Sequence, residues 1–226
     1  TGFLGFDIND GEFKVMSLSS YGNPIYEKEM EKLFDCEKLK INSSYFEFQK
    51  NPERSFSELF IQIFGKPYLN LGVKENFKKY SDIASSAQQI LNKSLKNLIL
   101  KAKQLTGKNK IVLTGGVALN CKMIHELSKQ KIFEELIVPP SPGDSGSAIG
   151  AANFSYFYEN NKFLKNIGLF PVPDKDVINK KFKLNEFFEK ISQQENSLKI
   201  ASELIIKGHI ITTYIDKTET GPRALG

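Results

Sequence analysis

The protein has 226 residues, a formal net charge of +5 and 40% hydrophobic residues, enough for one large domain or two small ones with a hydrophobic core. No apolar run approaches the roughly 20 residues that cross a bilayer, and the first residues lack the pattern of a signal peptide. Cys36 and Cys121 lie far apart without metal or redox spacing. We therefore expect reduced thiols and a cytoplasmic protein. The lysines are scattered over expected helix surfaces, so we expect neither a nucleic-acid nor a membrane partner.

The first 80 residues predict short elements. Residues 12–16 could form a short strand or a helical turn, and helices are expected over 25–39 and 55–64. Ser55 is the expected N-cap of the second helix, because Glu58 follows it by three positions.

A long amphipathic helix is predicted to begin at Ser81-Asp82 and to end at Gly107. Its apolar residues recur at intervals of three and four, which is typical of a helix with one buried face. Asp82 would then lie in the first turn, where the helix dipole favours a carboxylate.

Strands and helices alternate in the next part of the chain. Short apolar runs at 110–114 and 135–138 are typical of buried parallel strands, and helices are expected over 120–131 and 148–158. This alternation predicts an α/β fold with helices packed against a parallel or mixed sheet.

The C-terminal part begins with an expected linker over residues 159–175. Helices are predicted over 184–193 and 197–207, and Gly208 is a suitable residue to end the second of them. The β-branched run 209–215 predicts a strand.

Glycine-rich turns follow both strands of the alternating region. Gly115 and Gly116 let the backbone approach a ligand closely, and the following helix offers N–H groups to an anion; a tight connection without a ligand fits equally well. Asp144, in the second turn, could ligate a hard metal or orient phosphates, or it could cap the next helix. Because these turns follow successive strands, they would face one cleft.

Other polar residues carry less information. Arg223, after a Gly-Pro pair, could clamp a phosphate through two hydrogen bonds or could lie in a surface turn. His125 and His209 have no metal-like partner three or four residues away, so we expect structural roles for both. No general base can be assigned.

Five sequence blocks together indicate a family. They are Gly11–Met16 with Tyr21-Gly22, Asp82–Ala84 with Gln88, Thr114–Asn120, Gly143–Ala152, and Glu219 with Gly221–Gly226. In their order and spacing they resemble the O-carbamoyltransferases of nodulation-factor and antibiotic biosynthesis, over nearly the whole chain. Each block alone is modest, but five in order are specific.

The resemblance implies a fold and an activity. Residues 1–160 would be the C-terminal part of an actin-like ATPase (ribonuclease H-like) domain, 161–180 a linker, and 181–226 the truncated start of a second, α+β domain. In the family, the second domain forms carbamoyl-adenylate from ATP and carbamoyl phosphate, and the first transfers the carbamoyl group to a hydroxyl of a sugar or natural product. The sequence also has no starting methionine and stops inside a motif-like run at Thr220–Gly226, so we expect a piece of a longer protein.

The resemblance also implies roles for single residues. Gly115, Gly116 and Asn120 would line the nucleotide. Asp144 matches the family's ligand to a divalent metal of the iron type. Arg223 and Glu219 would belong to the carbamoyl phosphate site.

Some features depart from the family pattern. The family's histidine ligands would lie upstream of Thr1, so we expect little metal affinity and no activity from this chain alone. Residues 17–20 replace a Gly-Leu-Ala-Pro segment, and Lys217 replaces an arginine. An actin-fold sugar kinase and a non-catalytic nucleotide-binding module stay open as alternatives, and the sequence predicts neither the acceptor nor the oligomeric state.

Overall fold

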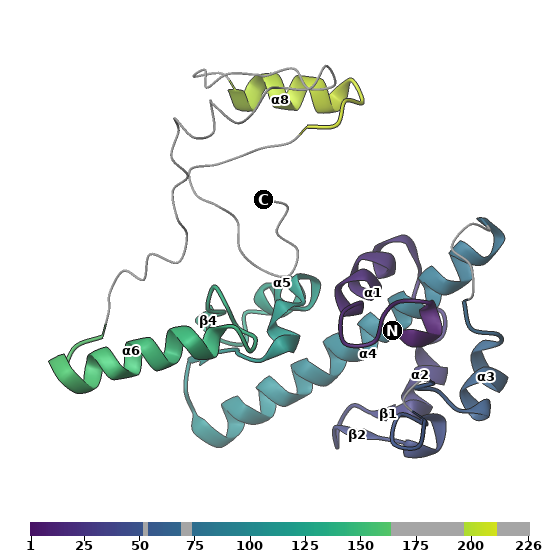
Figure 1. Cartoon of the computed structure of the whole chain (residues 1–226), viewed down its shortest axis with the longest axis horizontal. Helices are drawn as coiled ribbons and strands as arrows, with labels where there is room; N and C mark the ends of the chain where they lie inside the picture. The colour runs from purple at the N-terminus through teal and green to yellow at the C-terminus, as the bar shows by residue number, and fades with distance from the viewer. Residues whose placement is uncertain (52–53, 69–73, 164–196, 212–226) are drawn as a thin grey trace. The chain divides into compact units, whose positions relative to one another are not determined.

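The structure is a computed structural model that describes residues 1–51, 54–68, 74–163 and 197–211. It divides into two units, Thr1–Ala152 and Asn153–Gly226. The fold is of the α/β kind, mostly helical with two small sheets (Figure 1). In chain order the elements are η1 (Gly2–Leu4), α1 (Glu12–Leu18), η2 (Ser19–Tyr21), α2 (Glu27–Leu33), β1 (Phe34–Asp35), β2 (Lys40–Ile41), η3 (Ser43–Tyr45), α3 (Glu58–Phe64), α4 (Lys74–Thr106), β3 (Lys110–Val112), η4 (Gly116–Leu119), α5 (Cys121–Lys129), β4 (Glu135–Ile137), α6 (Gly146–Asn160) and α8 (Ser197–Ile206).

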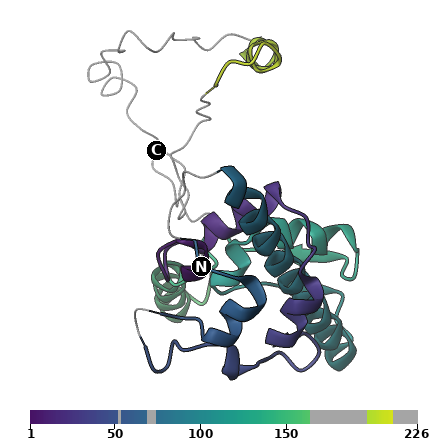
Figure 2. The same ribbon diagram turned by 90° about the vertical axis from the view of Figure 1, so that its right-hand side faces the viewer.

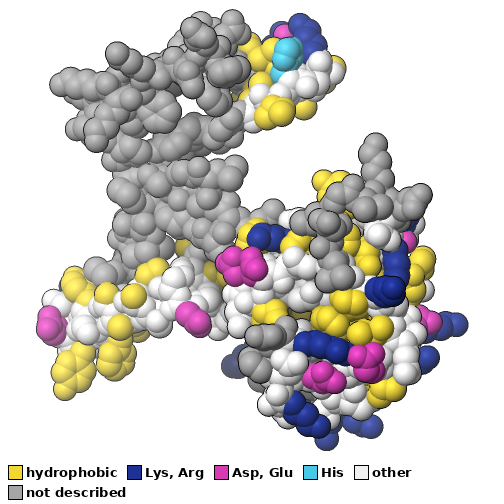
Figure 3. Space-filling model, turned by 45° about the vertical axis from the view of Figure 1, so that its right-hand side comes forward, with side chains coloured by type: hydrophobic (Ala, Val, Ile, Leu, Met, Phe, Trp, Pro, Cys, Tyr) yellow, Lys and Arg dark blue, Asp and Glu magenta, His cyan; other side chains and the backbone are white. Residues whose placement is uncertain are grey.

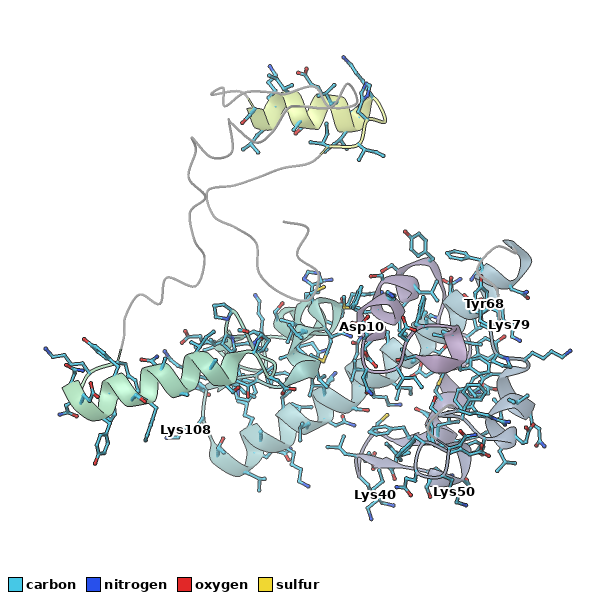
Figure 4. The ribbon with its side chains drawn as sticks, in the orientation of Figure 1. Asp10, Lys40, Lys50, Tyr68, Lys79 and Lys108 are labelled. Atoms are coloured by element: carbon cyan, nitrogen blue, oxygen red, sulfur yellow. The ribbon has the colours of Figure 1, made fainter. Side chains whose placement is uncertain are left out.

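Helix α4 is the central element of the first unit. Helices α1, η2 and α2 pack against it, as does α5 (Figures 1 and 2). Figure 4 labels Lys79, which lies in the second turn of this helix, and Lys108, which lies just beyond its C-terminal end. Gly107 ends the helix as predicted, with φ of +64°, a conformation that glycine adopts without steric cost.

An aromatic core surrounds the first half of α4. The rings of Phe60 and Phe64 lie 4.6 Å apart, and those of Tyr68 and Tyr80 lie 4.7 Å apart, edge to face. The Tyr80 hydroxyl donates to the carbonyl oxygen of Lys66 at 2.8 Å. Burial, and secondarily the neighbouring Tyr68, raises the pKa of Tyr80. This core fixes the position of the helix that carries Asp82 and Gln88.

A smaller core joins the second half of α4 to the β3–α5–β4 unit. Its buried members are Ile99, Met123 and Leu127. The two strands pair in parallel, as predicted. The expectation that they are buried on both faces is wrong, because Val112 is 60% and Ile137 is 40% exposed. The middle residues of the two strands, Ile111 and Leu136, are partly buried against this core, so the sheet has one packed face.

Several predicted helix boundaries also need correction. Residues 12–16 are helical, within α1, and the helix expected over 25–39 is only α2, followed by the antiparallel pair β1–β2. The N-cap of α3 is Ser57, whose hydroxyl accepts from the N–H of Phe60 at 3.4 Å, and not Ser55. Helix α4 begins at Lys74, so Asp82 lies in its interior.

In the second unit, α8 confirms the helix predicted over 197–207. Gly208 follows it with φ of +86°, and its N–H donates to Ile205 at 2.9 Å. Residues 209–211 form no strand. The rest of the predicted strand and the helix over 184–193 lie outside the described residues. None of the described helices combines the length and apolar character needed to span a bilayer.

Candidate functional site

The two glycine-rich turns lie side by side. They follow β3 and β4, whose parallel pairing sends both chains out at the same edge of the sheet. The N–H of Gly115 donates to the carbonyl oxygen of Pro142 at 2.7 Å. A Cβ built on Gly143 would lie 4.0 Å from the Cα of Gly116. The structure therefore brings Gly115 and Gly116 next to the turn that carries Asp144.

Gly115 has a backbone conformation that essentially only glycine adopts. Its φ of 98° and ψ of 161° place it in the extended region with positive φ. We expect Gly115→Ala to lower the free energy of unfolding by about 1–3 kcal/mol. Chemical denaturation of the variant checks this prediction, and an unchanged free energy of unfolding would contradict it.

Gly116 differs, because no contact with a described residue requires a glycine there. Its φ is not positive, and an added Cβ would meet no atom of the described residues within 4 Å. The backbone N–H groups of Gly116 and Val117 have no acceptor among the described residues, and neither do those of Asp144 and Ser145. Unpaired N–H groups gathered at one edge are suited to an anion such as a phosphate.

Asp144 is exposed. No described residue donates a hydrogen bond to the carboxylate or forms an ion pair with it, so Asp144 does not cap α6. Its backbone carbonyl oxygen instead accepts from the N–H of Ser147 at 3.0 Å and from the Ser147 hydroxyl at 2.6 Å. A hydrogen bond of 2.6 Å between the hydroxyls of Ser141 and Ser145 holds the turn. The carboxylate oxygens are therefore available to a ligand.

Asn120 has a structural role, in addition to any contact that it makes with a ligand. Its Oδ1 accepts from the N–H of Met123 at 3.0 Å, which caps α5. Its amide also pairs with the amide of Gln88 from α4. The third block of the family pattern is thus tied to the second.

The first block is tied to the second as well. A Cβ on Gly22 would lie 2.0 Å from the carbonyl oxygen of Ser81, so the loop touches the backbone of α4 directly. The N–H of Asn23 donates to Asp82 Oδ1 at 2.6 Å, and Lys78 forms an ion pair with the same carboxylate. Asp82 is 5% exposed, so it holds the loop in place and does not face a ligand.

Lys122 is a site-proximal residue that the sequence analysis missed. Its ammonium donates to the hydroxyls of Ser19 at 2.7 Å and Ser20 at 3.2 Å, which ties α5 to η2. No described carboxylate pairs with it. The helix dipole disfavours a lysine in the first turn of a helix. The position of Lys122, two residues after the N-cap Asn120, was therefore the sequence signal that could have indicated a special role.

Some predicted residues are not brought to this edge. Arg223 and Glu219 lie outside the described residues. His125 and His209 are exposed, and the described residues include no group of three or more His, Cys, Asp or Glu side chains that could hold a metal ion. A cleft of about 490 Å³ lies elsewhere, lined by residues of α4, α5, the loop before β4 and β4 itself, and it does not include the glycine turns.

The charged side chains form no basic stripe on the visible face. In Figure 3 the lysine and arginine side chains of the first unit lie among carboxylates and neutral groups. Some of the lysines of this unit form ion pairs, as Lys93 does with Glu31 and Lys110 with Glu135.

Comparisons with known proteins identify the family. The family model for the carbamoyltransferase N-terminus matches residues 1–153. An uncharacterised protein from Synechocystis is 28% identical over 248 residues, which cover 100% of this chain and 39% of that protein. Nodulation protein NolO from Bradyrhizobium diazoefficiens is 24% identical over 233 residues, covering 99% of this chain and 40% of that protein. Nodulation protein NolNO from Sinorhizobium fredii is 27% identical over 151 residues, which are 66% of this chain and 21% of that protein.

The chain thus spans about two fifths of the length of the first and second of these relatives. The family match includes both glycine turns, Asn120, Gln88 and Asp144. The chain belongs to the carbamoyltransferase family, through the N-terminal part that defines its family model.

Proposed function

We propose that the edge formed by Gly116 and the Asp144 turn binds the phosphates of ATP. Four backbone N–H groups that lack an acceptor among the described residues gather there, and Gly116 leaves open space where a side chain would project. Backbone N–H groups at a helix start bind phosphate without a cationic side chain. This cluster is the observation that carries the proposal.

We further propose that the full-length protein is an ATP-dependent O-carbamoyltransferase. Hydrolysis of carbamoyl phosphate would give carbamate and phosphate, and attack of a carbamate oxygen on the α-phosphorus of ATP would give carbamoyl-adenylate and release pyrophosphate. In carbamoyl-adenylate the carbamoyl group stays activated as a mixed anhydride. The acceptor hydroxyl of a sugar or natural product then attacks the carbamoyl carbon, the bond from that carbon to the AMP oxygen breaks, and AMP leaves. The β3–α5–β4 unit would be part of an actin-like ATPase fold, with the adenylate-forming step assigned to a following domain that includes Arg223 and Glu219.

Asp144 would supply one ligand to a divalent metal, for which iron is our first candidate. Its exposed carboxylate has no competing partner among the described residues, and such an oxygen ligand suits a hard cation. The remaining ligands would come from other parts of the full-length protein. When bound, the metal would polarise the carbamoyl carbonyl.

The phosphate-binding proposal predicts a specific effect of Gly116→Ala. The added methyl group meets no atom in the part of the chain that the structure describes, so the free energy of unfolding should be unchanged. It would project where the phosphates approach, and we expect ATP affinity to fall roughly tenfold. Titration calorimetry of the full-length protein with ATP measures this.

Gly150→Ala is the matched control. A Cβ on Gly150 also meets open space, but it lies within α6 and not in either turn. We expect its ATP affinity to equal that of the wild type. Equal affinity of Gly116→Ala and the wild type would contradict the proposed phosphate site.

A further inference from the structure

The buried contact between α4 and α5 contains a closed pair of amides. Gln88 Nε2 donates to Asn120 Oδ1 at 3.1 Å, and Asn120 Nδ2 donates to Gln88 Oε1 at 2.9 Å. Gln88 is 8% exposed, and its second Nε2 hydrogen goes to Asn92 Oδ1 at 2.9 Å. All hydrogen-bonding directions of the Gln88 amide are therefore taken up by the chain except one lone pair.

The orientation of the Asn120 amide follows from its role as the helix cap. The N–H of Met123 needs an acceptor, and Asn120 Oδ1 provides it at 3.0 Å. Because Oδ1 also accepts from Gln88, both of its acceptor positions are filled. Asn120 Nδ2 uses the hydrogen on the Oδ1 side for Gln88, and its other hydrogen has no acceptor among the described residues. Asn120 can therefore offer a ligand one N–H donor and no acceptor.

We propose that Gln88 is a positioning residue for the nucleotide, which holds Asn120 so that it presents this single N–H donor to an acceptor atom of ATP. The inference rests on the proposed ATP site. It adds that, in one contact of that site, the protein donates the hydrogen bond and ATP accepts it. Asn120 directly follows η4, whose first residue is Gly116, so the donor belongs to the same segment as the phosphate-binding turn. The atom it contacts is an acceptor: a phosphate oxygen, a ribose oxygen or a ring nitrogen.

A double-mutant cycle on the full-length protein tests this role. Gln88→Met keeps the length and removes the amide, and Asn120→Ser keeps a helix cap but removes the N–H donor. We expect each single variant to bind ATP about tenfold more weakly, which corresponds to one hydrogen bond. If Gln88 acts through Asn120, the double variant should also be about tenfold weaker.

The outcomes separate the inference from the proposed function. A hundredfold loss in the double variant would show independent effects and overturn the positioning role, as would unchanged affinity of Gln88→Met. If the wild type does not bind ATP, the proposed function itself fails. Asn92→Ala is the control, since it removes the outer partner of Gln88 but leaves the amide pair, and its affinity should stay within about twofold of the wild type.

Two further measurements complete the test. In NMR spectra of the wild type, ATP should shift one of the two Asn120 side-chain amide protons and leave the other in place; movement of neither would overturn the inference even if Gln88→Met does not fold. Adenosine distinguishes the acceptor. A loss of adenosine affinity in Asn120→Ser indicates the nucleoside, and an unchanged affinity with weaker ATP binding indicates a phosphate oxygen.

Discussion

Asp144→Ala in the full-length protein is expected to lower carbamoyl transfer to the acceptor hydroxyl about a thousandfold. The variant would lose a metal ligand, and the carbonyl would no longer be polarised as the hydroxyl attacks. Carbamoyl-adenylate formation should continue, because we assign it to another domain. Radiolabelled carbamoyl phosphate measures transfer, and exchange of pyrophosphate into ATP measures the first step.

Asp10→Ala is the matched control for this prediction. Asp10, labelled in Figure 4, is an exposed carboxylate in the loop before α1. Its removal should change neither reaction. Wild-type transfer by Asp144→Ala would remove Asp144 from the metal site, and loss of both reactions would show that it also serves adenylate formation.

The second large effect concerns stability. Gly22→Ala would place a methyl group 2.0 Å from the carbonyl oxygen of Ser81, so the loop must move away from α4. That movement would break the hydrogen bond from Asn23 N to Asp82 at 2.6 Å. We expect a loss of about 3–5 kcal/mol in the free energy of unfolding, as overpacking and the loss of a charge-assisted hydrogen bond combine. Thermal or chemical denaturation measures it.

Gly150→Ala again provides the control. At this position in α6 an added methyl group meets open space, and alanine favours a helix by about 0.5–1 kcal/mol over glycine. The variant should be as stable as the wild type or slightly more so. If Gly22→Ala is equally stable, the loop does not contact α4 as closely as the structure shows.

The sequence predicted the local periodicities well. The apolar repeat of α4 and the alternation from β3 to α6 could be recognised in the sequence. In each case the spacing of apolar residues depends on which side of the element faces a core. The parallel pairing of β3 with β4 followed from the helix between them. Gly107 and Gly208 were predicted to end helices. Both have a positive φ in the structure, which favours glycine.

The errors came from tertiary contacts that local patterns do not encode. The long helix was predicted to begin at Ser81, but Ser81 is fully buried within α4 and its hydroxyl donates to Phe77 O one turn earlier. Asp82 therefore lies inside the helix, where it binds a loop 59 residues away in sequence. The β1–β2 pair was missed because its strands have two residues each, too short for an alternation to appear.

The candidate site was predicted only in part. Both glycine turns could be found from their position after strands, and the structure brings them together. The amide pair of Gln88 with Asn120 could not be found, because it joins residues 32 apart in sequence. Lys122 was hidden for the same reason, since its partners lie more than 100 residues earlier.

The most direct test is to identify the products that the full-length protein forms from ATP, carbamoyl phosphate and hydroxylated acceptors. We predict AMP, pyrophosphate, phosphate and an acceptor that carries the carbamoyl group. ADP together with a phosphorylated acceptor would contradict carbamoyl transfer and would establish a phosphotransferase instead.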